Sequence, residues 1–315
     1  MNISIFKKDG NKFYMKDFFE KNILDEIKKN ESPPAQIENF ISAAECQNLI
    51  NYFQNLKNKS VGKSQFIERE ESTKIFFKLD QSHEIKKLYQ KIQDIIGEFY
   101  VNDFQPHIIT SRYPLRLHVD TGKNPNDLIF KNVIIPLEVE YDLEKKNHCP
   151  PNTLIFKNTW YDQSALFTNH TDNDKDFIIK DSNGKFVDIL NIDDFFNKIQ
   201  KFNEDEIEYN ENVFRINDNF KDYIKRLTEI KRYNLRTNKH IVNDKNFNRD
   251  LYEKYLSHQQ YEDCKSLELD KAIETKVGSL IYWDRTRIHS SDNFIKNNVK
   301  SKTLLALFTS KTKIS

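Results

Sequence analysis

Apolar residues recur at helical spacing in two stretches of the first hundred positions. Residues 36–58 open with a short apolar strand pattern and continue with Ser42 and Glu45, the residue pair of a capping box. Apolar residues then return every three or four positions, and residues 84–100 repeat this spacing. Both stretches therefore predict amphipathic helices, and we expect each helix to cover a sheet.

The spacing changes to strand-like runs after Pro106. These runs are short, rich in β-branched and aromatic residues, and separated by turn-forming segments such as TGKNPND and HCPPN. Consecutive strands without long helices between them favour an antiparallel sandwich or jelly roll. The predicted strand runs lie in residues 107–120, 133–142, 152–167, 276–283 and 302–310.

The remaining stretches indicate how the chain is divided. Residues 1–35 are charged and end in Pro33-Pro34, so we interpret them as an N-terminal arm. We expect residues 36–315 to form a single domain, because sandwiches and barrels often reach this size as one unit. The domain would carry a large mixed or helical insertion at about 170–270, with helix-like patches in residues 193–202 and 220–233.

Charge and cysteine content narrow the class of protein. The 49 lysines and arginines nearly balance the 48 aspartates and glutamates, which argues against a nucleic-acid partner. The three cysteines are far apart and form no CxxC pair, so the sequence gives no sign of a disulfide framework. No apolar run reaches the length of a membrane span or a signal-peptide core. We therefore expect a cytoplasmic protein.

His118 and Asp120 are the first candidates for chemistry. Alternate residues of a strand point to the same face, so their metal-binding atoms can converge on one ion. With a distant histidine, such a pair forms the triad of two histidines and one carboxylate that binds Fe(II) and leaves other positions open. A second pair, His170 and Asp172, lies in a polar stretch without strand character, and we expect it to be solvated.

His289 is the candidate for the third ligand, because it follows the buried strand pattern of GSLIYWDR and precedes the polar SSDN. A lone histidine at such a place is more often a hydrogen-bonded core residue. Lys302, thirteen positions later, opens the apolar strand TLLALFT. A buried cation requires a partner, and the carboxylate of a bound acid would serve. Lys300 is the alternative cation, but it belongs to a polar turn.

This combination resembles the iron(II)/2-oxoglutarate-dependent dioxygenases of the prolyl-hydroxylase-like and phytanoyl-hydroxylase-like type. The resemblance spans about residues 35–170 and 255–310 and leaves the insertion uncovered. It implies a mainly β fold with flanking helices, namely a double-stranded β-helix or cupin-like jelly roll with an N-terminal helical layer. The matching motifs are His118-Val119-Asp120, the segment Gly278 to Asp284, His289 and Lys302.

The resemblance also implies cofactors. His118, Asp120 and His289 would bind Fe(II), and 2-oxoglutarate would chelate this metal as the cosubstrate, with dioxygen at the remaining position. Lys302 would receive the far carboxylate of 2-oxoglutarate. Many members use an arginine followed two residues later by a serine, whereas this chain has Lys302-Thr303-Leu304, so a second anchor must lie elsewhere. The candidates for this second anchor are Tyr113, Ser111 and Asn132.

The substrate is left open by the sequence. Arg116, Arg285 and Arg287 are candidates for binding an acidic group, although ion pairs with residues such as Asp284 are an equal alternative. The implied reaction hydroxylates a small-molecule or peptidyl substrate and releases succinate and CO2. Two other functions fit the same residues: a cupin-like binding module without turnover, and a zinc hydrolase, which would not need Lys302.

Overall fold

A computed structural model describes most of the chain. The described residues are 6–9, 12–15, 17–60, 66–79, 82–102, 106–167, 178–180, 186–188, 199–202, 206–209, 212–215, 247–264 and 267–314. Their contacts divide the chain into two compact units, of which the first comprises residues 1–18 and 167–237 and the second comprises residues 19–166 and 238–315. The second unit contains every residue that the sequence nominates for chemistry, except His170 and Asp172, which lie outside the described residues.

A seven-stranded antiparallel sheet forms one half of the second unit. Strand β5 (Ser72–Phe76) shows the two faces of the sheet, because Thr73 and Ile75 are buried on one side while Lys74 points to the other. Strand β8 (Ile129–Tyr141) is buried over its first nine residues, which is typical of a central strand. In order across the sheet the strands are β3 (Ala35–Ile37), β17 (Leu280–Asp284), β8 (Ile129–Tyr141), β19 (Val299–Ser310), β6 (His107–Ser111), β5 (Ser72–Phe76) and β4 (Phe66–Glu68).

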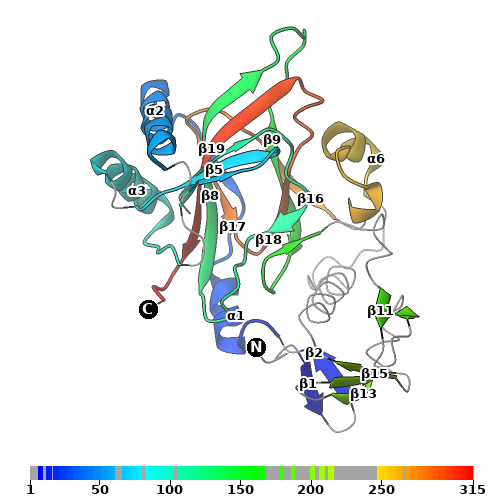
Figure 1. Cartoon of the computed structure of the whole chain (residues 1–315). Helices are drawn as coiled ribbons and strands as arrows, with labels where there is room; N and C mark the ends of the chain where they lie inside the picture. The colour runs from blue at the N-terminus through cyan, green and yellow to red at the C-terminus, as the bar shows by residue number, and fades with distance from the viewer. Residues whose placement is uncertain are drawn as a thin grey trace. The chain divides into compact units, whose positions relative to one another are not determined.

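Two helices cover the outer face of this sheet, as the sequence predicted. Helices α2 (Ala43–Ser60) and α3 (His83–Ile96) lie side by side against it (Figure 1), and their apolar residues share one core with the strands. The expected capping box starts α2, since the N–H of Glu45 donates to Ser42 Oγ and the N–H of Ser42 donates to Glu45 Oε2. A further helix, α1 (Lys21–Lys29), precedes β3.

Gly278 fixes the approach of the chain to β17. Its φ of 79° lies in the left-handed region, and a Cβ at this position would lie 2.4 Å from the carbonyl oxygen of Ile41. The N–H of Ile41 donates to the carbonyl of Gly278 over 2.9 Å. Only glycine therefore allows the start of α2 to pack this closely against the strand that leads toward His289.

A five-stranded antiparallel sheet forms the other half of the unit. Its strands, in order, are β10 (Ala165–Leu166), β7 (His118–Val119), β18 (Arg287–Ser291), β9 (Asn152–Thr159) and β16 (Leu269–Glu274). Ile155 and Ile273 of this sheet pack in one buried cluster with Ile109, Ile134 and Leu304 of the larger sheet. Since the two sheets share a core, the mainly β, jelly-roll-like architecture with flanking helices is confirmed.

The described parts of the first unit are short antiparallel strands. They are the hairpins β1 (Phe6–Asp9) with β2 (Lys12–Met15) and β11 (Ile178–Lys180) with β12 (Phe186–Asp188), and the three-stranded sheet of β13 (Ile199–Phe202), β14 (Glu206–Tyr209) and β15 (Asn212–Arg215). The helix expected in residues 193–202 is wrong for its last four residues, because they pair with β14. The helix expected in residues 220–233 lies outside the described residues, and the expected division into an arm and one domain stays a prediction.

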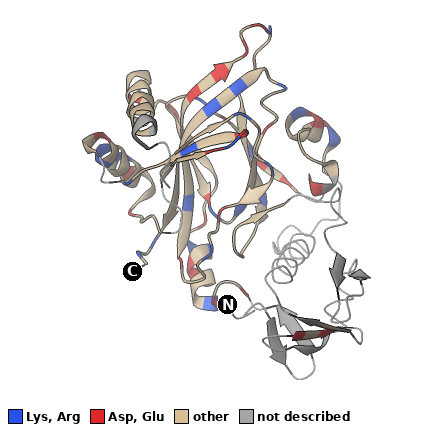
Figure 2. Cartoon of the chain, in the orientation of Figure 1, with Lys and Arg blue, Asp and Glu red and all other residues tan. Residues whose placement is uncertain are grey.

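Residues 247–264 return to the second unit. They form α6 (Arg249–Leu251), a π-helical turn (Tyr252–Leu256) and a 3₁₀ turn (Tyr261–Cys264). Across this unit lysines and arginines alternate with aspartates and glutamates instead of gathering by sign (Figure 2). In the described part of the chain, no helix is both long enough and apolar enough to cross a membrane.

Candidate metal centre and cavity

His118, Asp120 and His289 come together on the inner face of the five-stranded sheet. Strands β7 and β18 run antiparallel with His118 and His289 directly opposite each other, so both rings project to the same side, with centroids 4.1 Å apart. Asp120 follows His118 by two residues, and its Oδ2 lies 3.1 Å from Nε2 of His289 and 3.7 Å from Nε2 of His118. The potential ligand atoms all lie within 4.8 Å of one another, so the three side chains could hold one metal ion.

The backbone orients both imidazole rings. Nδ1 of His118 lies 2.7 Å from the carbonyl oxygen of Arg116, and Nδ1 of His289 lies 2.9 Å from that of Arg287. A carbonyl oxygen only accepts, so each Nδ1 carries a proton, and Nε2 of each ring, the atom nearer to Asp120, is the atom available as a metal ligand. Two imidazole nitrogens and one carboxylate oxygen are a donor set that suits Fe(II).

The electrostatic surroundings of the centre set the protonation of His118 and Asp120. Burial lowers the pKa of His118 to about 4, with a further contribution from His289, so the ring is neutral at pH 7. Burial alone would raise the pKa of Asp120, but His118, His289 and Arg285 outweigh it and hold that pKa below its usual value. Asp120 is therefore ionised beside the neutral ring of His118, and both are in the state that binds a divalent metal.

Arg285 holds the backbone of the candidate ligand Asp120 in place. Its guanidinium is fully buried with Asp127, and Nε donates to the backbone carbonyl of Asp120 over 2.7 Å. Asn132 lies on the neighbouring β8, where Nδ2 is 3.4 Å from Asp120 Oδ2. Trp283 packs edge-on against His289, with ring centroids 4.9 Å apart. Hence both the carboxylate and the distal imidazole are held by the larger sheet.

A cavity of about 420 Å³ opens beside these three residues, and Lys302 lines it. Lys302 is 2% exposed, and its Nζ donates to Ser291 Oγ over 3.0 Å and lies over the ring of Phe294. Among the described residues, no carboxylate oxygen lies within 4.0 Å of this ammonium group. Burial lowers the pKa of Lys302 to about 8, and Asp292 partly offsets that effect. The lysine is thus a buried cation that faces a cavity and has no ion-pair partner in the part of the chain that the structure describes.

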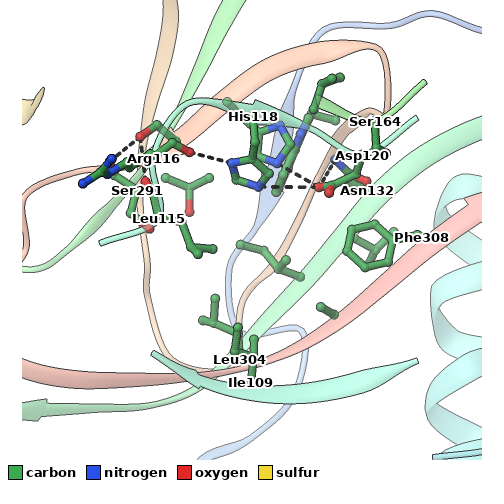
Figure 3. A pocket seen from close by; sticks show the side chains of 18 of the residues that line it. Ile109, Leu115, Arg116, His118, Asp120, Asn132, Ser164, Ser291, Leu304 and Phe308 are labelled. Atoms are coloured by element: carbon green, nitrogen blue, oxygen red, sulfur yellow. Dashed lines mark hydrogen bonds and ion pairs between the residues drawn. The ribbon is translucent and has the colours of Figure 1, made fainter. Parts of the chain in front are cut away.

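The other nominated residues divide into those that reach the cavity and those that do not. Figure 3 shows His118, Asp120 and Asn132 grouped at one wall, with Leu304 and Ile109 adjacent on another. The exposed Arg116 also lines the cavity.

Tyr113, Ser111, Lys300, Arg285 and Arg287 are not among the lining residues. Tyr113 is 47% exposed and Lys300 is exposed, whereas Ser111 is buried directly opposite Lys302 with no partner for its hydroxyl among the described residues. Arg287 pairs with Asp270 and Asp284, so the ion-pair alternative describes this arginine.

Gln259 is a positioning residue that could not be selected from the sequence. Its side chain is buried and bridges the two ligand strands, because Oε1 accepts from the N–H of Leu117 over 3.1 Å and Nε2 donates to Ser290 Oγ over 3.3 Å. Each contact is made next to a metal-ligand candidate, His118 or His289. A lone glutamine in a polar segment carries no pattern that would reveal such a bridge.

We expect Gln259→Met to lower the affinity for metal about tenfold, because loss of a group that orients ligands typically costs ten- to hundredfold. Titration with Co(II), followed by its visible absorption, measures this affinity. The exposed neighbour Gln260 supplies the matched control, and Gln260→Met should bind Co(II) as the wild type does. Equal affinities in the two variants would show that the bridge does not orient the ligands.

Comparison with known proteins gives structural neighbours only. No protein-family model matches the sequence, and no curated protein matches it. A prolyl-4-hydroxylase from Pseudomonas putida aligns at 8% identity over 93% of this chain and 98% of its own, with a TM-score of 0.37.

Two further solved structures align over similar lengths. A collagen prolyl hydroxylase of Paramecium bursaria Chlorella virus-1 aligns at 10% identity over 90% of this chain and 97% of its own, with a TM-score of 0.36. An alpha-ketoglutarate-dependent carbocyclase of nogalamycin biosynthesis aligns at 9% identity over 93% of this chain and 86% of its own, with a TM-score of 0.41. At these identities and TM-scores the likeness carries no functional conclusion.

Proposed function

We propose that this protein is an Fe(II)- and 2-oxoglutarate-dependent oxygenase that hydroxylates its substrate and releases succinate and CO2. One observation carries the proposal: three side chains that could hold a metal ion line the same cavity as a buried lysine that has no carboxylate partner among the described residues. The ligands account for the metal, and the lysine accounts for an acid bound beside it. Neither feature alone distinguishes an oxygenase from other metal proteins.

The residues present fit the group that the proposal requires. His118, Asp120 and His289 would hold the iron from one side, which leaves the cavity side for cosubstrate and dioxygen. When bound, iron and 2-oxoglutarate supply an oxidant generated from dioxygen. Arg285 holds the backbone of Asp120 and Asn132 holds its carboxylate, while the lining of the cavity is largely apolar.

Lys302 selects the cosubstrate in this proposal. Its ammonium would receive the far carboxylate of 2-oxoglutarate, and Ser291, which already accepts a hydrogen bond from Nζ, can donate its own hydroxyl proton to the same carboxylate. Asn132 also lines the cavity, and the amide Nδ2, which lies 3.4 Å from Asp120 Oδ2, has a second N–H that can donate to a cosubstrate carboxylate. We assign no cosubstrate contact to Tyr113, because it does not line the cavity.

Each alternative leaves one feature of the cavity without a use. A zinc hydrolase needs the metal ligands and a water but not Lys302, whereas a binding module without turnover has no need of the complete set of metal ligands. Retaining a desolvated ammonium group without a carboxylate partner is costly, so its presence favours a function in which an acid fills the cavity. The free cysteines, Cys46 and Cys264 among them, are consistent with the reducing cytoplasm that we propose as its compartment.

Anaerobic addition of Fe(II) and 2-oxoglutarate should produce a visible charge-transfer band, and admission of oxygen should then yield succinate. The band requires the metal and the cosubstrate to share one site, and succinate requires turnover. Zn(II) in place of Fe(II) is the control, which should give neither signal. Folded protein that shows neither band nor succinate with Fe(II) would contradict the proposal, and hydrolytic activity with Zn(II) would favour the hydrolase instead.

A further inference from the structure

Lys74 is a second lysine in the cavity, and none of the functions assigned so far uses it. It lies on β5, where its register partner is Ile109 of β6, which in turn pairs with Leu304 of β19. All three residues line the cavity, so Lys74 belongs to the row of side chains that faces the metal centre. Its strand neighbours Thr73 and Ile75 are buried on the opposite face of the sheet.

The surroundings of Lys74 are unfavourable for a cation. Its side chain is partly buried among apolar residues, and no hydrogen bond or ion pair joins its Nζ to another residue in the described ranges. Burial lowers the pKa of Lys74, while the charge of Asp120 opposes that effect. The same ammonium acts on His118, whose pKa it lowers. The ammonium group of Lys74 therefore interacts electrostatically with His118 and Asp120, yet within the described residues it forms no ion pair with either.

The charges of the metal, the cosubstrate and the lining residues indicate which kind of group Lys74 could bind. A divalent metal with the single carboxylate of Asp120 leaves one positive charge, and Lys302 adds another. The two carboxylates of 2-oxoglutarate compensate these two charges. Among the charged residues that line the cavity, Lys74 and Arg116 then remain uncompensated, which would weaken metal binding unless a further anion enters the cavity.

We propose that Lys74 binds an anionic group of the substrate, a carboxylate or a phosphate, and thereby makes the enzyme selective for acidic substrates. This inference rests on the proposed function, because the substrate is the molecule that enters after metal and cosubstrate. Arg116, at the exposed edge of the same cavity, would add to the attraction. Leu115 and Leu166 also line the cavity and would contact an apolar part of the same molecule.

The test uses the full chain loaded anaerobically with Fe(II) and 2-oxoglutarate, after the charge-transfer band has formed. The probes are matched pairs that differ in charge: N-acetylated amino acids against their carboxamides, and phosphate monoesters against the parent alcohols. The shift of the band on titration gives a dissociation constant for each probe. Comparison of the two sets of pairs distinguishes a carboxylate from a phosphate as the preferred group.

We expect the anionic member of the preferred pair to bind at least about tenfold more tightly than the neutral one, because a hydrogen bond to a charged group contributes more than one between neutral groups. Lys74→Met and Lys74→Gln should both abolish this preference, whereas Lys74→Arg should keep most of it. The exposed Lys300 supplies the control, since Lys300→Met should retain the full preference.

Three results would overturn the inference while the band still forms. They are equal or tighter binding of the neutral probes, no binding of any probe by the wild type, and an undiminished preference in both Lys74→Met and Lys74→Gln. Absence of the band in the wild type is a different result, because it refutes the proposed function itself before a probe is added. The two failures are thus distinguished within one experiment.

Discussion

Alanine in place of His289 should reduce the affinity for Fe(II) more than about 100-fold and abolish succinate formation at micromolar iron. The expected loss exceeds the ten- to hundredfold cost of removing a group outside the metal's ligand sphere, because a direct ligand disappears. Nε2 of His289 is also the imidazole nitrogen nearer to the Asp120 carboxylate, at 3.1 Å against 3.7 Å for His118. Anaerobic titration with Fe(II) and a succinate assay measure the two losses.

His148 provides the control for this variant. It lies in an exposed turn and does not line the cavity. Its Nε2 forms a hydrogen bond with the backbone carbonyl of Asp142. His148→Ala should therefore bind iron and form succinate as the wild type does. If His289→Ala binds iron with wild-type affinity while remaining folded, the ligand set proposed here is wrong.

Strand periodicity explains why the architecture could be predicted from the sequence. The strands around His118, Ile134 and Leu304 are short apolar runs bounded by turn residues, and the capping residues Ser42 and Glu45 mark the start of α2. Such signals lie within one segment of the sequence, so they can be recognised without knowledge of the fold. The strand β13 was missed because its residues have helical spacing, and only pairing with β14 gives them an extended conformation.

The candidate site was predictable only where residues are linked by strand geometry. His118 and Asp120 could be paired because alternate strand residues share a face, and His289 followed from its place after a buried strand. Lys74 was not a candidate, because residues 72–76 mix polar and apolar side chains and the sequence predicted no strand there. Gln259 contacts Leu117 across 142 positions of sequence, and no local pattern encodes that contact.

Lys302→Met should weaken the binding of 2-oxoglutarate roughly 100-fold while leaving the affinity for metal largely intact. Removing one partner of a buried charge pair typically costs several kcal/mol, and methionine keeps the length of the side chain without its charge. Titration of the charge-transfer band with 2-oxoglutarate measures the loss. The exposed Lys300 again provides the control, and Lys300→Met should bind 2-oxoglutarate normally. Equal affinities in the two variants would remove Lys302 from the cosubstrate site.

The same substitution should make the protein without cosubstrate more stable, by roughly 3 kcal/mol at pH 7. The pKa of Lys302 is about 8 in the folded protein, below the ordinary value of 10.5, so the unfolded chain binds more protons between these two values. The stability of the wild type therefore rises with pH across this window, and the advantage of Lys302→Met should shrink above pH 8 and vanish near pH 10.5. Urea unfolding of both proteins at pH 7 and pH 10 measures the difference. If Lys302→Met binds 2-oxoglutarate more weakly but is more stable, Lys302 serves binding at a cost in stability. If the variant loses both affinity and stability, Lys302 has a structural role.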